Sequence, residues 1–240
     1  MNILVTGVSR GVGLEICSVL LNHGYTVYGI ARTYTRELKE LEEKFKERFF
    51  FKNIDLINSE NIPKLVFKDF ITNKIPLEGF VNNAAVAYDD LLTNLNIDRL
   101  KKMYEINVFS PLVITKYVIR NMIFNNIAGS IVHISSISVH TGYKGLTMYA
   151  SSKGALEAFS KNTAREWGGL GIRSNVVVPG FMETTMSSTL TDNQKEKIYN
   201  RTSLKSATDI NSVAETVAFL LSEKAKSITG QNIHVDNGTI

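Results

Sequence analysis

The chain opens with Asn2-Ile3-Leu4-Val5-Thr6-Gly7-Val8-Ser9-Arg10-Gly11-Val12-Gly13-Leu14-Glu15-Ile16. The apolar, β-branched run at its start predicts a parallel strand buried on both faces. Three glycines follow, and the amphipathic stretch 14–22 predicts a helix that ends at Gly24. Glycines let a pyrophosphate approach the backbone, and the first amides of the helix then face the anion. This stretch therefore predicts a dinucleotide-binding strand–turn–helix unit.

Strand and helix patterns alternate through the rest of the chain. We predict one domain over residues 1–240, an α/β fold with a doubly wound parallel sheet of the Rossmann type and helices on both faces. A long helix is expected over 103–122, and a last helix over 208–222 is capped by Thr208 or Asp209. The weakly patterned stretch from 181 to about 206 predicts a substrate lid. Further strands are expected at 26–31, 49–54, 79–82, 131–134, 172–178 and 232–235.

Composition excludes several classes of function. The 27 basic and 23 acidic side chains give a net charge of +4 and no basic stripe for nucleic acid. Cys17 is the single cysteine, which excludes an internal disulfide and fits a reducing, cytoplasmic location. We expect no signal peptide, no membrane span and, because the four histidines lack ligand spacing, no metal site.

Tyr149-Ala150-Ser151-Ser152-Lys153 places a phenol and an ammonium one helical turn apart. The ordinary pKa of tyrosine is about 10, and unit charges at ~4 Å interact by about 4 kcal/mol at an intermediate dielectric. We therefore expect Lys153 to lower the pKa of Tyr149 into the range useful for proton transfer. Ser136 follows a buried strand, and its hydroxyl could reach the same space. The three groups suit polarising and protonating a carbonyl, although such Tyr–Lys pairs also arise by chance.

The charged residues that follow the second predicted strand indicate which nicotinamide cofactor is bound. That strand is followed by Arg32, and no acid to hold a ribose diol occurs before Glu37. Arg10 and Arg32 instead offer guanidinium groups for a 2′-phosphate, which favours NADP(H) over NAD. The alternative is that both arginines are ordinary solvated surface groups.

Polar residues follow two other strands. Asp55, with Leu56, and Asn83 are expected at the adenine side of a bound cofactor, although turn chemistry alone also explains Asx residues there. Asn107 is polar within an apolar stretch, so it could position a group or a water.

Together these residues resemble the short-chain dehydrogenase/reductase family, and the likeness covers essentially the whole chain. It rests on the glycine turn, Asn82-Asn83-Ala84, Asn107, Ser136, the Tyr149–Lys153 pair and Pro179-Gly180-Phe181-Met182-Glu183-Thr184. The resemblance implies that Tyr149 is the general acid or base, that Lys153 holds the nicotinamide ribose, that Ser136 binds the substrate carbonyl and that Asn107 anchors a water. It also implies cofactor contacts from Gly7, Ser9, Arg10, Gly11, Val12 and Gly13 at the phosphates, Arg32, Asp55 and Leu56 near the adenosine, Asn83 at its ribose, Tyr149 and Lys153, and Met182 and Thr184 at the nicotinamide.

Within the family, stretches 178–186 and 228–238 most resemble bacterial 3-oxoacyl-[acyl-carrier-protein] reductases. This resemblance implies a 3-oxoacyl thioester substrate, an acyl carrier protein as partner, and a homotetramer paired through helices near 100–122 and 150–167. The Tyr–Lys spacing is unlike that of the divergent enoyl reductases. The chain departs from the pattern at Ala85, where glycine is usual, and at Ile127 and Leu170, where basic residues help to dock the carrier. Candidate substitutes for those charges are Lys161, Arg165 and Arg173.

Two alternatives remain at this stage. The same chemistry could act on another ketone or alcohol, such as a sugar or secondary metabolite, because apolar Phe181, Met182 and Met186 fit an acyl chain but also other substrates. A cofactor-sensing protein without turnover is the other alternative, although it would be expected to lack one of the Ser–Tyr–Lys residues.

Overall fold

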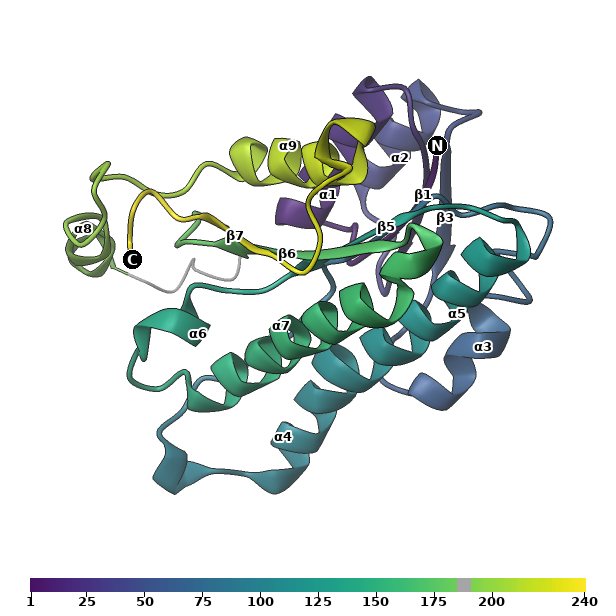
Figure 1. The fold of residues 1–240 in the computed structure, drawn as a ribbon. Coiled ribbons are helices and arrows are strands. Elements are labelled where there is room, and N and C mark those ends of the chain that lie inside the picture. Colours follow the sequence, from purple (N-terminus) through teal and green to yellow (C-terminus); the bar gives the residue numbers. More distant parts are fainter. Residues whose placement is uncertain (185–190) are drawn as a thin grey trace.

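The computed structural model describes residues 1–184 and 191–240 of the chain. They form a parallel seven-stranded sheet in the order β3-β2-β1-β4-β5-β6-β7 (Figure 1). This order reverses direction between β1 and β4, as in a doubly wound nucleotide-binding sheet, so the predicted fold class is confirmed. The strands are β1 (Asn2–Thr6), β2 (Thr26–Ala31), β3 (Phe49–Asn53), β4 (Gly79–Asn82), β5 (Ser130–Ile134), β6 (Arg173–Pro179) and β7 (Asn232–Val235).

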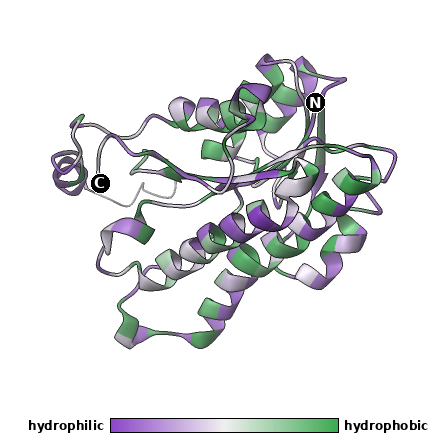
Figure 2. Cartoon of the chain, in the orientation of Figure 1, coloured by the Kyte–Doolittle hydropathy of each residue, from purple (hydrophilic) through white to green (hydrophobic). Residues whose placement is uncertain are grey.

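Helices cover both faces of the sheet. On one face α1 (Gly11–Asn22) packs against α9 (Ile210–Leu221), and α2 (Arg36–Lys44) lies towards the β3 edge. The other face carries α3 (Ile62–Leu65), α4 (Ile97–Tyr104), α5 (Ser110–Phe124) and α7 (Thr147–Trp167). Two short helices, α6 (Ser138–Thr141) and α8 (Asp192–Tyr199), lie beyond the ends of the strands. Polar and apolar residues alternate around the helices, as expected where one side of each is buried (Figure 2).

The predicted first strand lies in the middle of the sheet. Leu4 pairs with Tyr28 of β2 on one side and with Phe80 of β4 on the other. Ile3, Leu4 and Val5 are fully buried because helices cover both faces. The central position of β1 places the glycine turn that follows it at the point where the strand order reverses.

The stretch 103–122, expected as a long helix, is helical throughout, but it is not one regular α-helix. The chain there forms α4, a π-helical segment at Glu105–Phe109 and then α5. Pro111 has no N–H and cannot make the regular α-helical bond to the carbonyl of Asn107, so the ladder is interrupted at this point. The last helix begins as expected, and of its two candidate caps Asp209 is the one that accepts bonds from the first free amides.

Candidate active site

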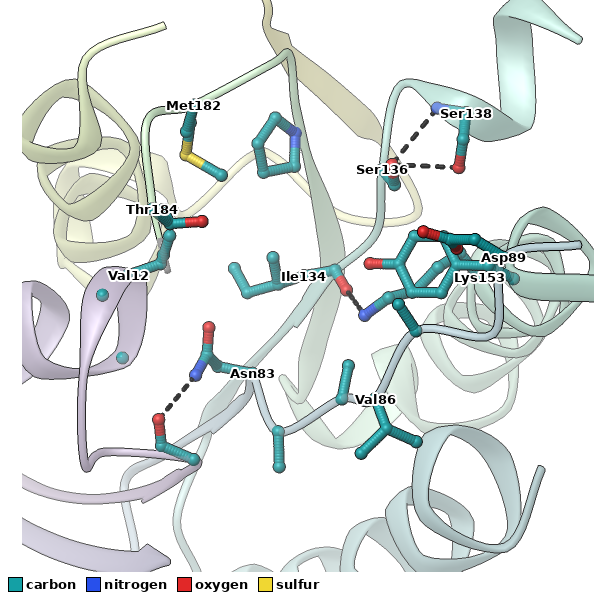
Figure 3. A pocket seen from close by; sticks show the side chains of 18 of the residues that line it. Val12, Asn83, Val86, Asp89, Ile134, Ser136, Ser138, Lys153, Met182 and Thr184 are labelled. Carbon is teal, nitrogen blue, oxygen red and sulfur yellow. Dashed lines mark hydrogen bonds between the residues drawn. The ribbon is translucent and has the colours of Figure 1, made fainter. Parts of the chain in front are cut away.

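A groove of about 1300 Å³ runs along the carboxyl ends of the strands (Figure 3). Its lining begins at the glycine turn after β1, crosses the segments after β2, β3, β4, β5 and β6, and reaches α8. Every residue predicted to bind the cofactor or the carbonyl lines it, which brings together positions from 7 to 184. Asn107 does not line the groove.

The glycine turn is shaped by close contacts with the segment after β4. Gly7 has φ +73°, and a Cβ there would lie 2.7 Å from the Cα of Ala84. A Cβ on Gly13 would lie 2.1 Å from the carbonyl oxygen of Gly7. Gly11, at φ +56°, would meet nothing closer than 3.9 Å, so the turn is open where it faces the groove. This arrangement fits a phosphate cradle whose backbone approaches its ligand closely.

Lys153 and Tyr149 lie on one face of α7, as their spacing predicts. The Lys153 side chain is buried, and its Nζ donates a 2.8 Å hydrogen bond to the carbonyl oxygen of Ile134 at the end of β5. The same Nζ lies 5.7 Å from the centroid of the Tyr149 ring. Burial lowers the pKa of Lys153 from its ordinary value to about 8. Both side chains therefore line the groove, and the hydrogen bond to Ile134 fixes the Lys153 ammonium to the end of β5.

The expected lowering of the Tyr149 pKa is wrong. Burial of the phenol raises its pKa, and the negative charge of Asp89 raises it further. The Lys153 ammonium is bonded to a backbone carbonyl instead of to the phenol oxygen. Tyr149 therefore stays protonated at neutral pH.

Ser136 lies in the turn after β5, on the same side of the groove as Lys153 (Figure 3). Its Oγ accepts hydrogen bonds from the backbone N–H of Ser138 at 3.2 Å and from the Ser138 hydroxyl at 3.0 Å. Because Ser136 accepts both bonds, its own hydrogen is left to donate to an oxygen in the groove. Ser138 was not singled out in the sequence, although a serine two residues on is a typical partner in such turns.

Known proteins resemble this chain over its whole length. A family model described as Enoyl-(Acyl carrier protein) reductase matches residues 7–239. The 3-oxoacyl-[acyl-carrier-protein] reductase of Buchnera aphidicola subsp. Schizaphis graminum is 34% identical over 235 residues, which are 98% of this chain and 95% of that protein. The L-xylulose reductase of Caenorhabditis elegans is 32% identical over 241 residues, which are 98% of this chain and 94% of that protein. This chain belongs to the short-chain dehydrogenase/reductase family.

Solved structures agree with this assignment. A 4-hydroxyisoleucine dehydrogenase complexed with NADH and succinate superposes with a TM-score of 0.89 and 26% identity, covering 99% of this chain and 98% of that one. A variant of ElxO with NADPH bound superposes with a TM-score of 0.87 and 27% identity, again covering 99% and 98%. The family makes the protein an oxidoreductase of CH–OH and C=O groups. The two structures contain different nicotinamide cofactors.

In this family member, Asn107 serves as a positioning residue through its side chain. It is fully buried, and its Oδ1 accepts from the N–H of Val86 at 2.9 Å. Its Nδ2 donates to the carbonyl of Val86 at 2.9 Å and to the Ser152 hydroxyl at 3.0 Å. The amide thereby joins the segment after β4 to α7 beside Lys153. Both of its amide hydrogens are used within the protein, and the water that the resemblance assigns to Asn107 stays a prediction.

Asn83 and Asp55 also bond within the protein. Asn83 donates from Nδ2 to the carbonyls of Thr6 and Gly7, at 3.0 and 3.1 Å, and so holds the glycine turn against β4. Asp55 accepts from the N–H of Ile57 at 3.1 Å, which is the turn chemistry left open as an alternative. Both residues still line the groove, where their contacts with a cofactor remain a prediction.

A buried carboxylate, Glu157, lies behind the site, and no pattern in the sequence pointed to it. Glu157 lies one turn beyond Lys153 on α7, and Ser135 Oγ donates to it at 2.5 Å. His140 Nε2 lies 3.1 Å from the same oxygen, while Asn232 of β7 donates to the other oxygen at 2.7 Å. This network fixes the turn that carries Ser136 from both sides.

The remaining groove residues lie opposite the catalytic side. Met182 and Thr184 follow β6 and face the glycine turn (Figure 3). Arg10 and Arg32 are exposed at the groove, and the side chain of neither forms an ion pair within residues 1–184 and 191–240. Of the apolar lid residues, Met186 lies outside the described residues, as does the stretch 185–190 of the predicted lid.

The described residues, 1–184 and 191–240, bear on two other kinds of site. They contain no group of three or more His, Cys, Asp or Glu placed to hold a metal ion. None of their helices combines the length and the apolar character that a membrane crossing requires.

Proposed function

We propose that the protein reduces a ketone to a secondary alcohol with NADPH and that the ketone is a 3-oxoacyl thioester. The observation that carries this proposal is the convergence of Ser136, Tyr149 and Lys153 at one side of the groove. NADPH would supply hydride to the carbonyl carbon when bound. Ser136 donates a hydrogen bond to the carbonyl oxygen, and Tyr149 donates its proton to that oxygen as negative charge develops.

The raised pKa of Tyr149 keeps the phenol in the protonated form that the proposed reduction uses. A phenol that stays protonated at neutral pH is ready to act as an acid, whereas oxidation first requires the phenolate. Lys153, held by the Ile134 carbonyl, contributes a nearby positive charge that stabilises the phenolate left after proton transfer.

The experiment is steady-state NADPH oxidation with the acetoacetyl thioester of N-acetylcysteamine, a small neutral mimic. Turnover above that of a Tyr149→Phe control supports the proposal. NADPH binding without turnover across a broad panel of ketones would instead favour the cofactor-sensing alternative.

A second candidate substrate is a sugar or another small ketone. The observation that favours it is the 32% identity to an L-xylulose reductase over nearly the whole chain. The three-residue gap between Tyr149 and Lys153 favours either ketone chemistry over enoyl reduction. Comparing kcat/KM for L-xylulose and for the acetoacetyl thioester separates the two.

The preference for NADPH is carried by Arg10 and Arg32. Replacing both by alanine is expected to lower kcat/KM for NADPH by about 10- to 100-fold, with less than about threefold change for NADH, because only NADPH carries the 2′-phosphate. Arg36→Ala is the matched control, since Arg36 is exposed and paired with Glu40 at 2.9 Å away from the groove. An equal fall in kcat/KM for NADPH and for NADH would show that the arginines do not recognise the 2′-phosphate.

Asp89, together with burial, is expected to influence the pH dependence of catalysis by Tyr149. The charge of Asp89 raises the pKa of the phenol, so Asp89→Asn should lower that pKa. In a plot of kcat/KM for alcohol oxidation against pH, the rise on the acidic side should then move to lower pH. At pH 7 we expect kcat/KM for oxidation of a 3-hydroxyacyl thioester to rise by about threefold. Asp98→Asn, a change at the exposed start of α4, is the control. A pH profile that Asp89→Asn leaves unmoved would contradict this coupling.

We also propose a cytoplasmic homotetramer that accepts acyl carriers. Exposed Phe109, Ile123 and Phe124 around α5 support pairing between subunits. For carrier docking, Lys161 and Arg165 are exposed on α7, but Arg173 cannot take part as suggested, because its guanidinium donates to carbonyls at the end of α9. Leu170 is also exposed, so the usual basic residue is replaced there by an apolar surface.

A further inference from the structure

Three cations line the end of the groove that lies away from the glycine turn. Lys144 comes from the turn between α6 and α7, while Lys197 and Arg201 come from α8 and the turn after it. These elements follow β5 and β6, on the other half of the sheet from Arg10 and Arg32. Figure 1 shows α6 and α8 on the same side of the molecule. The three charges are therefore separate from the pair assigned to the cofactor.

The basic residues of helix α8 lie on two different faces of the helix. Its groove-lining residues, Gln194, Lys197 and Ile198, are followed by Arg201 at the spacing of a single helix face. Lys195 does not line the groove and instead lies 3.5 Å from the carboxylate of Glu183. The paired lysine, Lys195, thus lies off the groove, whereas Lys197 lines it. The groove face presents the cations that carry no carboxylate partner.

No ion pair within residues 1–184 and 191–240 neutralises Lys144, Lys197 or Arg201. Arg201 instead lies 6.0 Å from the ring centroid of Tyr143, next to Lys144. Among the described residues, three carboxylates line the groove: Asp55 after β3, and Asp89 and Asp90 after β4. Asp90 is bonded to the N–H of Leu91 and to Asn94, while Asp89 lies by the catalytic side, close enough for its charge to act on Tyr149.

Charge along this part of the groove is thus ordered: negative near the reacting oxygen and positive at the outer end. We propose that Lys144, Lys197 and Arg201 bind a phosphate that the substrate carries at a distance from its ketone. A thioester carrier with a phosphorylated pantetheine arm has this chemistry. Asp89 would repel an anion placed directly beside the ketone. The inference rests on the proposed function, which supplies the ketone thioester, but it adds the group by which the substrate is selected.

The test compares two substrates that differ in the phosphate alone, acetoacetyl-pantetheine and acetoacetyl-4′-phosphopantetheine. Wild-type protein is expected to show a lower KM for the phosphorylated form, with similar kcat, because the phosphate lies far from the reacting atoms. The triple variant Lys144→Gln/Lys197→Gln/Arg201→Gln should raise KM for the phosphorylated form by about tenfold, and change KM for the neutral form by less than about twofold. Sodium chloride at about 500 mM should reproduce part of this loss in the wild type.

Lys195→Gln is the matched control, because it removes the same charge from the same helix on the face that does not line the groove. It should leave the preference for the phosphorylated form unchanged. The three single variants, each expected to lose part of the preference, keep the test valid if the triple variant folds poorly.

The outcomes distinguish the two proposals. Turnover of both thioesters with equal KM in the wild type, or an equal loss on both in the triple variant, overturns the phosphate site and leaves the proposed function intact. Absence of turnover with either thioester overturns the proposed function itself.

Discussion

Replacing Tyr149 by phenylalanine is expected to lower kcat for ketone reduction by about 10³-fold, because the carbonyl oxygen then loses its proton donor. The ring remains, so the groove keeps its shape. Binding of NADPH, followed by the change in its fluorescence, should stay within about twofold of the wild type. The measurement is single-turnover NADPH oxidation at saturating cofactor and ketone.

Tyr117→Phe removes a phenol oxygen from α5, where Tyr117 stacks on Phe67 outside the groove, and serves as the control. Turnover by Tyr149→Phe at more than about a tenth of the wild-type rate would remove Tyr149 from the acid role.

Replacing Lys153 by methionine is expected to lower kcat by about 10²-fold, because the charge that stabilises the phenolate is lost. The same variant tests the buried ammonium in a second way. Because the pKa of Lys153 falls from an ordinary 10.5 to about 8 on folding, the unfolded chain binds more protons between these values. The free energy of unfolding of the wild type should therefore rise with pH in this window.

The comparison of the two proteins isolates that effect. Between about pH 8 and pH 10 the wild type should gain about 2 kcal/mol relative to Lys153→Met, measured by urea unfolding of the cofactor-free proteins. Below about pH 8 the difference between them should be constant, since the lysine is then charged in both states. Lys161→Met, an exposed lysine on the same helix, should follow the wild type. Parallel curves for wild type and Lys153→Met would show that the pKa of the ammonium is not depressed.

The parts of the site that sequence predicted are those set by local chemistry. The contact of Gly13 with the carbonyl of Gly7 lies within one strand–turn–helix unit, and the placement of Tyr149 and Lys153 follows from the period of one helix. Their chemistry needs particular residues at fixed spacing, and the spacing is visible in the chain.

Except for the break in the long helix, the parts that sequence missed depend on distant neighbours. The pKa of Tyr149 is governed by burial and by Asp89, which comes from the segment after another strand. The polar side chain of Asn107 was visible, but not that Val86 and Ser152 would use its amide. Pro111 was a local signal for the break in the long helix, because proline cannot donate to the carbonyl four residues earlier.

The contact between Asn232 and Glu157 has a consequence for the order of events in synthesis. A ribosome delivers strand β7 after β1 to β6, yet β7 supports, through Glu157 and Ser135, the turn that carries Ser136. A nascent chain can assemble the glycine turn earlier, once β4 and Asn83, which bonds to the carbonyls of Thr6 and Gly7, have been synthesised. The turn that carries Ser136 gains its full support only when β7 docks, so this side of the groove should become ordered only after residue 235 has been synthesised.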